Sequence, residues 1–254
     1  MQKELVPFQA EAAWTIGDWQ TVAQTANKGG PPIADVFLAI RDGKDITEAL
    51  VNARRKIGST ITSREYARAY DAVLQLHMLR EVEMIYATDR SITSPRDNRN
   101  AGAIVRRQAD ELIATLSERF DMTLPVFRVH EEVLNKRRAV FSLMHSHRLR
   151  SEQGQAWIQS AKIARKAGYE QTAYSAALQA HEADAPFAFI QAAKLIHQNG
   201  DILKALRELE NPVARLVKES DDPEIIEIDA PPKTEDDFRR HRSLAKVGRF
   251  VSHC

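Results

Sequence analysis

The residues best suited to metal or acid–base chemistry in this sequence are its eight histidines, which are scattered along the chain. His145 and His147 lie closest together, but residues two apart on a helix do not share a face. No carboxylate completes a ligand set with them, so a surface or capping role is favoured over a metal site. His77 falls on the apolar stripe of a long expected helix and is interpreted as a core histidine. We therefore expect no metal in this chain.

Motifs for phosphate binding and catalysis are also missing from the sequence. The turn GGPP at 29–32 lacks the lysine of a phosphate-binding loop. The segment DDFRRH at 236–241 matches a metal-binding Asp-Phe-Gly motif only in its Asp-Phe, and no catalytic-loop aspartate with an asparagine partner occurs. No nucleophile, base or ligand set converges elsewhere. The sequence predicts no catalytic residue and no cofactor in this chain.

Basic residues form clusters, but the chain as a whole is almost neutral. It carries 36 Lys and Arg against 35 Asp and Glu, which gives no electrostatic reason to expect nucleic-acid binding. The set at 162–166 has helical spacing and is interpreted as a solvated face, while the last cluster weakly resembles a nuclear-targeting patch. The clusters are Arg106–Arg107, Lys136–Arg138, Lys162 with Arg165 and Lys166, and Arg239–Arg242.

Composition limits the class of protein. The chain has 254 residues, of which 43% are hydrophobic, and is long enough to bury a core. Its one cysteine, at the last position, excludes a disulfide framework and a cysteine-based zinc site. The N-terminus lacks the apolar core of a signal peptide, and charges interrupt every apolar run before it could span a membrane. We expect a soluble, intracellular protein.

Nearly the whole chain shows helical periodicity, with glycine and proline between the periodic segments. The pairs Asp45/Glu48 and Thr62/Glu65 have the spacing of capping boxes. The longest helix follows the second pair, with an inward stripe of Tyr66, Tyr70, Val73, Leu74, His77, Val82 and Ile85. We expect helices ending near Gly17, starting at Asp18, and covering about 33–43, 45–60, 66–85, 101–119, 129–146, 157–167, 169–181, 187–198 and 202–210.

Two stretches break this pattern and divide the chain. Residues 88–100 are polar and lose periodicity, so an exposed loop is predicted there. Beyond residue 220 the chain is acidic and contains proline, then turns basic, which predicts a flexible tail over 220–254. One helical-repeat domain is expected over 1–219.

Glycines mark the expected turns between helices. Gly17, Gly43, Gly168 and Gly200 each end a helix, where glycine can adopt a positive φ. An alanine follows each glycine by five or six positions and lets a neighbouring helix approach closely: Ala23, Ala49, Ala173 and Ala205. Trp14, Trp19 and Trp157 are interpreted as core anchors. In the first helix, Phe8, Ala12, Ala13 and Ile16 are expected to face inward.

The spacing of these turns favours a repeat. Gly168 and Gly200 are separated by nearly the tetratricopeptide period of about 34 residues, although Gly17 and Gly43 are closer. The pattern predicts an all-α fold, an α-solenoid of tetratricopeptide-like helical hairpins, and a non-repeating helical bundle is the alternative.

The segments VLNKRRAVFSLMHS and WIQSAKIARKAGYEQTAYSAALQA, with AAWTIGDW, EALVNARRKIGS, REYARAYDAVLQLHMLREVE and FDMTLPVFRVHEEVL before them, carry a family resemblance. Together they resemble the FAT region of the phosphatidylinositol-3-kinase-related protein kinases, most closely the fungal ATR-type checkpoint kinases. The resemblance covers about residues 5 to 210. It implies a helical solenoid that wraps a kinase domain and bears no catalytic residue of its own.

The resemblance also implies a nuclear setting and protein partners: the kinase domain, other solenoid segments and an ATR-type partner subunit. Direct contact with nucleic acid or membrane is not expected. Because the kinase motifs lie outside this sequence, we interpret the chain as a fragment whose parent family has ATP-dependent serine/threonine kinase activity. The alternative is a stand-alone helical-repeat adaptor for protein–protein interaction.

Overall fold

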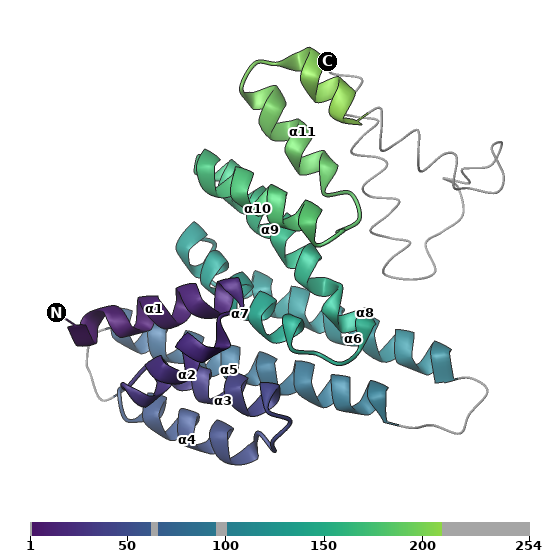
Figure 1. The fold of residues 1–254 in the computed structure, drawn as a ribbon. Coiled ribbons are helices and arrows are strands. Elements are labelled where there is room, and N and C mark those ends of the chain that lie inside the picture. The colour runs from purple at the N-terminus through teal and green to yellow at the C-terminus, as the bar shows by residue number, and fades with distance from the viewer. Residues whose placement is uncertain (1, 62–65, 95–100, 210–254) are drawn as a thin grey trace. The chain divides into compact units, whose positions relative to one another are not determined.

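A computed structural model describes residues 2–61, 66–94 and 101–209 of the chain (Figure 1). In these ranges all regular secondary structure is helical, which confirms the predicted all-α class. The predicted capping box at Thr62 and Glu65, the tail at 220–254 and the basic cluster at Arg239–Arg242 lie outside the described residues. The chain divides into two compact units, Met1–Gln153 and Gly154–Cys254. The predicted single repeat domain over 1–219 stays a prediction.

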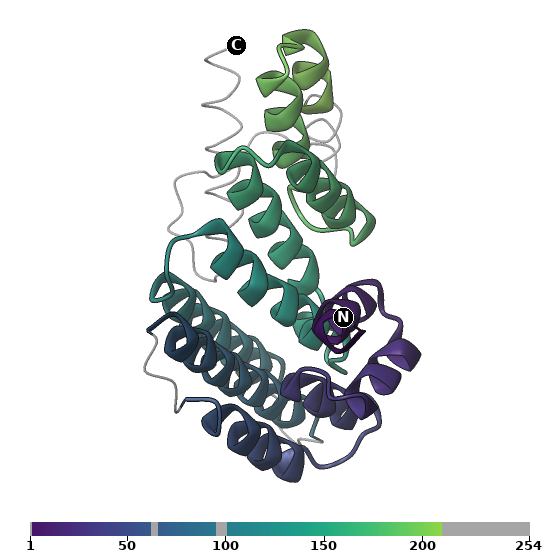
Figure 2. The same cartoon turned by 90° about the vertical axis from the view of Figure 1, so that its left-hand side faces the viewer.

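The first unit is a succession of helices in which each of the first five packs on the next. The two longest, α5 and α6, lie side by side in both views (Figure 2). α7 packs on α1, α5 and α8, so it ties the beginning of the unit to its end. The helices are α1 (Gln2–Ile16), α2 (Trp19–Asn27), α3 (Pro32–Arg41), α4 (Thr47–Gly58), α5 (Tyr66–Thr93), α6 (Ala101–Asp121), α7 (Phe127–Ser142) and α8 (His147–Arg150).

The second unit is built from helices with small side chains between them. α10 packs on α11, and the buried face of α10 consists of alanines at helical spacing: Ala173, Ala176, Ala177 and Ala180. Trp157 and Ile158 of α9 cover the end of this face. The helices are α9 (Glu152–Lys166), which starts just before the unit boundary, α10 (Glu170–Glu182), α11 (Phe189–Gln198) and a further helical stretch at 202–209.

Several expected boundaries differ from the structure. The predicted exposed loop begins too early, because α5 continues as helix to Thr93 and buries Asp89. The expected helix over 129–146 starts and ends too late, since α7 spans Phe127–Ser142 and α8 begins only at His147. α9 begins at Glu152, five residues before the expected start.

The predicted inward faces of α1 and α5 are partly wrong. Val6, Ala10, Ala13 and Trp14 are the buried residues of α1, whereas Phe8 and Ile16 are 69% and 78% exposed and Ala12 is exposed as well. In α5, Leu74, Val82 and Ile85 are buried as expected, but Val73 is exposed. Three apolar side chains of α1 therefore form a second, outward stripe, Leu5, Phe8 and Ile16.

Candidate functional site

The predicted turn glycines all have left-handed backbone geometry. Gly17, Gly43, Gly168 and Gly200 have φ values of 77°, 67°, 82° and 87°. At Gly168, the glycine N–H donates to the Arg165 carbonyl oxygen at 3.3 Å and the next N–H donates to the Ala164 carbonyl oxygen at 2.9 Å. This pair of bonds is the Schellman motif, which satisfies carbonyl groups at the end of a helix. The same pair of bonds occurs at the other three glycines.

The predicted packing residues differ in their burial. Trp14 is buried and meets the ring of Phe37 edge-on at 5.5 Å between centroids, and Trp19 meets the same ring at 6.5 Å. Trp19 and Trp157 are only half-buried. Ala173 and Ala205 are fully buried, whereas Ala23 and Ala49 are half-buried.

The basic cluster Lys136–Arg138 lies in the interior of the first unit. The exposed fractions of these side chains are below a tenth, within an unbroken buried run, Val133–Phe141 of α7. Each of the three cations meets a carboxylate: Lys136 meets Glu132 at 2.6 Å, Arg137 meets Glu81 at 2.7 Å, and Arg138 meets Glu131 at 2.6 Å. We call these six residues the α7 charge cluster.

Glu81 is the most deeply buried member of the cluster. Arg137 donates to both of its carboxylate oxygens, at 2.7 Å and 2.8 Å, and the His77 ring nitrogen lies 3.1 Å from one of them. Arg119 of α6 approaches the same carboxylate at 3.5 Å. Burial alone would raise the pKa of Glu81, but the hydrogen bonds from Arg137 and His77 outweigh it and hold the pKa below its ordinary value. Glu81 is therefore a buried anion that joins α5 to α6 and α7.

A neutral residue next to the cluster extends it to α1. The side-chain oxygen of Asn135 accepts hydrogen bonds from the indole of Trp14 at 3.2 Å and the hydroxyl of Thr15 at 3.0 Å. Its amide nitrogen donates to Glu11 at 2.9 Å. Because one amide pairs with three side chains of α1, the rotation of α1 on α7 is fixed.

Asp89 fixes the start of α8. Its buried carboxylate accepts the backbone N–H groups of His145 and Ser146 at 3.1 Å and 2.8 Å. These N–H groups belong to the N-cap residue of α8 and the residue before it, so the carboxylate satisfies the backbone where the chain enters the helix. Asp89 thus has a structural role that polar composition alone did not reveal.

The three histidines singled out in the sequence differ in their surroundings. His77 is half-buried against Glu81, whereas His145 and His147 are exposed. Within the described ranges, no three His, Cys, Asp or Glu side chains gather closely enough to hold a metal ion.

The two other basic sets within the described residues are at least partly exposed. Arg106 and Arg107 lie at the surface, and Arg107 pairs with Glu111 at 2.8 Å. Lys162 and Arg165 are half-buried and Lys166 is exposed. The solvated face predicted for this last set is therefore only partly solvated.

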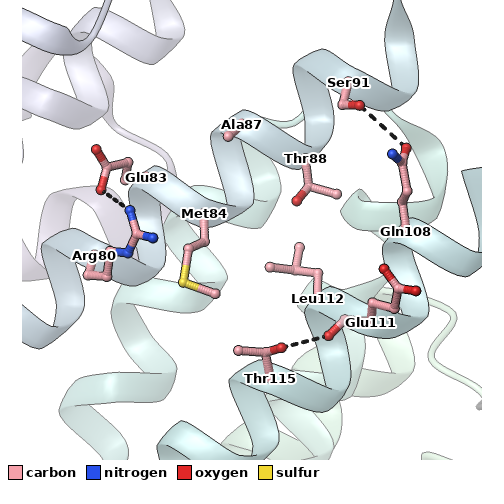
Figure 3. A pocket seen from close by; sticks show the side chains of 10 residues that line it. All are labelled: Arg80, Glu83, Met84, Ala87, Thr88, Ser91, Gln108, Glu111, Leu112 and Thr115. Atoms are coloured by element: carbon pink, nitrogen blue, oxygen red, sulfur yellow. Dashed lines mark hydrogen bonds and ion pairs between the residues drawn. The ribbon is translucent and has the colours of Figure 1, made fainter.

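The open side of the α5–α6 hairpin carries a groove of about 560 Å³ (Figure 3). Met84 and Leu112 point into it from the two helices. Its charged groups already have partners, such as Arg80 with Glu83 at 2.7 Å. Mixed polarity and paired charges suit a protein contact better than a small charged ligand. No helix that the structure describes has the length and apolar character needed to cross a bilayer.

Comparison with known proteins identifies relatives along most of the chain. The family model described as the FAT domain matches residues 6–254. Serine/threonine-protein kinase ATR of Drosophila melanogaster is 28% identical over 183 residues, which cover 68% of this chain and 7% of the relative. ATR of Oryza sativa subsp. japonica is 26% identical over 222 residues, covering 79% and 8%. ATR of Arabidopsis thaliana is 24% identical over 260 residues, covering 92% and 9%.

The chain thus spans less than a tenth of the length of these curated relatives. No solved structure gives a significant match to it.

Proposed function

Because the chain belongs to the FAT domain family, we propose that it is a non-catalytic helical scaffold segment of an ATR-like serine/threonine protein kinase in the DNA-damage checkpoint. The observation that carries this proposal is the family match over almost the entire chain, together with ATR kinases among its relatives. The activity belongs to a kinase domain in the same polypeptide. This chain supplies support for that domain and needs no cofactor of its own.

The physical character of the first unit supports a structural role. Its polar interior is an ion-pair and hydrogen-bond network that joins α1, α5, α6 and α7. Buried polar groups that are paired with one another favour one arrangement of helices over alternatives. A segment that must hold other domains in a fixed relation benefits from such rigidity. We propose that the hairpins continue as a tetratricopeptide-like α-solenoid in the parent protein.

The proposal extends to partners and location. The segment contacts the kinase domain, neighbouring solenoid segments and an ATR-type partner subunit. We propose that the parent protein is a fungal kinase and that the segment acts in the nucleus. Direct contact with DNA is not part of its role, because the chain carries almost equal numbers of positive and negative side chains.

The test is made in the source cell. Full-length transcripts are read through the coding region, and an antibody against residues 151–210 is used to measure the size of the native product and to precipitate it. The scaffold role predicts a transcript that continues in frame into a kinase domain, and ATP-dependent phosphorylation of a serine/threonine peptide by the precipitate. An Arg137→Met change at the chromosomal locus should lower this activity more than the control Arg107→Met.

A different outcome would favour the adaptor. A transcript that ends at Cys254, together with a stable small protein and no kinase activity in the precipitate, would overturn the scaffold proposal. The proteins that co-purify with the small product would then define its function.

A further inference from the structure

A second cavity of the first unit lies where α1, the turn before α3, and α7 meet, and its volume is about 340 Å³. We call it the α1–α7 pocket. Its residues come from separate elements that pack together, so the pocket exists only in the folded unit. The lining residues used below are Pro7, Glu11, Trp14, Gly29–Ile33, Ile57, Glu132 and Lys136.

One wall of the pocket is apolar and held in place. Pro7, Pro31 and Pro32 contribute rigid rings, and Ile33 and Ile57 add aliphatic surface. The indole of Trp14 is fixed by its hydrogen bond to Asn135. Such a wall suits the methylene groups of an extended side chain.

The backbone of the turn at the pocket offers almost no hydrogen-bond donors. Proline has no N–H group, so Pro31 and Pro32 cannot donate. The N–H groups of Gly29 and Gly30 already donate to the carbonyl oxygens of Ala26 and Thr25, at 3.2 Å and 3.0 Å. The backbone of this turn therefore has no N–H group left to bind an anion, so an anionic ligand is disfavoured.

Among the described side chains that line the pocket, carboxylates outnumber cations by one. Glu11 and Glu132 face a single cation, Lys136, which pairs with Glu132 at 2.6 Å. The carboxylate of Glu11 accepts a hydrogen bond from the neutral amide of Asn135 at 2.9 Å. Arg138 interacts electrostatically with Glu11, but it pairs with Glu131 at 2.6 Å and does not line the pocket.

We infer that the α1–α7 pocket binds an arginine side chain of a partner polypeptide. The methylene groups would lie along the proline and isoleucine wall, and the guanidinium would reach Glu11 and Glu132. Arginine is favoured over lysine because its planar group carries five donors and is weakly hydrated, which matches the two carboxylates. This inference goes beyond the scaffold role and does not depend on it.

The test uses the 254-residue chain and a pentapeptide with blocked ends, arginine at its centre and alanine elsewhere. A matched peptide carries citrulline, which has nearly the same shape but no charge. Titrations are followed by the NMR signals of the Trp14 indole and the Gly29 and Gly30 amides. The arginine peptide should shift these signals saturably and the citrulline peptide should not.

Matched variants locate the binding site. Glu11→Gln and Glu132→Gln should each weaken binding of the arginine peptide by about tenfold, the loss expected for one charge-assisted hydrogen bond. Both changes keep an oxygen that can accept the existing hydrogen bond, so the fold is retained. The control Glu118→Gln removes an exposed carboxylate of α6 and should leave the affinity unchanged. Equal binding of the citrulline peptide, equal losses in all three variants, or no shift of the pocket signals would each overturn the inference.

Discussion

Arg137 and Glu81 show how a single buried pair determines the packing of several helices. Their side chains are 7% and 0% exposed and come from residues far apart in the sequence. Removing one partner of a buried pair leaves an uncompensated charge in the interior, which costs more than the pair itself contributes to stability.

We predict that Arg137→Met destabilises the first unit by about 3 to 5 kcal/mol, because Glu81 loses its bidentate partner. Hydrogen exchange of the α7 amides measures this loss, since protected amides report the opening of the unit around them. Arg107→Met is the matched control, because its pair with Glu111 is exposed to solvent and should contribute little. Equal hydrogen exchange in the two variants would show that the buried pair contributes no more to stability than the exposed pair.

The low pKa of Glu81 also predicts how stability depends on pH. A carboxyl group whose folded pKa lies below its ordinary value of 4.5 stabilises the folded state at higher pH. This contribution is fully present above the unfolded pKa and is lost as the pH falls through the folded pKa. The stability difference between the natural chain and Glu81→Gln should therefore shrink as the pH is lowered from about 7 to about 3. Urea unfolding across this range measures it, and a constant difference would contradict the prediction.

At the scale of the element, helix ends depend on glycine conformation. Gly168 has a φ of 82°, and a Cβ added there would meet no atom within 4 Å, so backbone strain is the main cost of any side chain. We predict that Gly168→Ala costs about 1 to 2 kcal/mol, the penalty for a left-handed residue with a Cβ.

The control for this change is Gly58→Ala. Gly58 also has open space around it, but it lies within α4 and has no positive φ. Alanine should leave the stability there unchanged or raise it slightly, because alanine favours helix. Thermal unfolding followed by circular dichroism compares the two variants. A similar melting temperature for both would mean that Gly168 does not need its left-handed conformation.

Local sequence signals predicted most helices but not the interior charges. Asp18 caps α2, because its carboxylate accepts a hydrogen bond from the Thr21 N–H at 3.1 Å. Gly17, Gly43, Gly168 and Gly200 end helices, as residues near them in the sequence predict. Lys136–Arg138 look like any exposed basic run, because their identity as interior residues depends on Glu81, which is distant in the sequence. The sequence likewise predicts a loop at Asp89. The backbone groups that this side chain binds, at residues 145 and 146, come close to it only through tertiary packing.

The prediction of the inward face of α1 was partly wrong for a related reason. Its apolar residues lie on two faces, and periodicity alone cannot say which of them meets α7. Asn135 determines which face of α1 packs on α7, because its hydrogen bonds to Trp14, Thr15 and Glu11 orient the helix. What remains outward is the stripe of Leu5, Phe8 and Ile16.

For the whole molecule, this outward stripe governs how the chain behaves in solution. Three large apolar side chains on one helix face are an unfavourable surface in water, and burying them against another molecule releases that cost. We predict that the 254-residue chain is helical but self-associates, and that its thermal transition is broad. Sedimentation velocity over a range of concentrations measures the association.

The double change Phe8→Glu with Ile16→Glu should shift the chain toward monomer, because it places charges on the stripe without touching the buried face of α1. Val51→Glu is the control, since Val51 is an exposed apolar residue of α4 outside the stripe. If both changes reduced self-association equally, general surface hydrophobicity and not the stripe would be its cause. A monomeric chain with a sharp two-state melt would contradict the prediction and favour a self-sufficient adaptor, because a segment of a larger solenoid is expected to leave an apolar face for its neighbours.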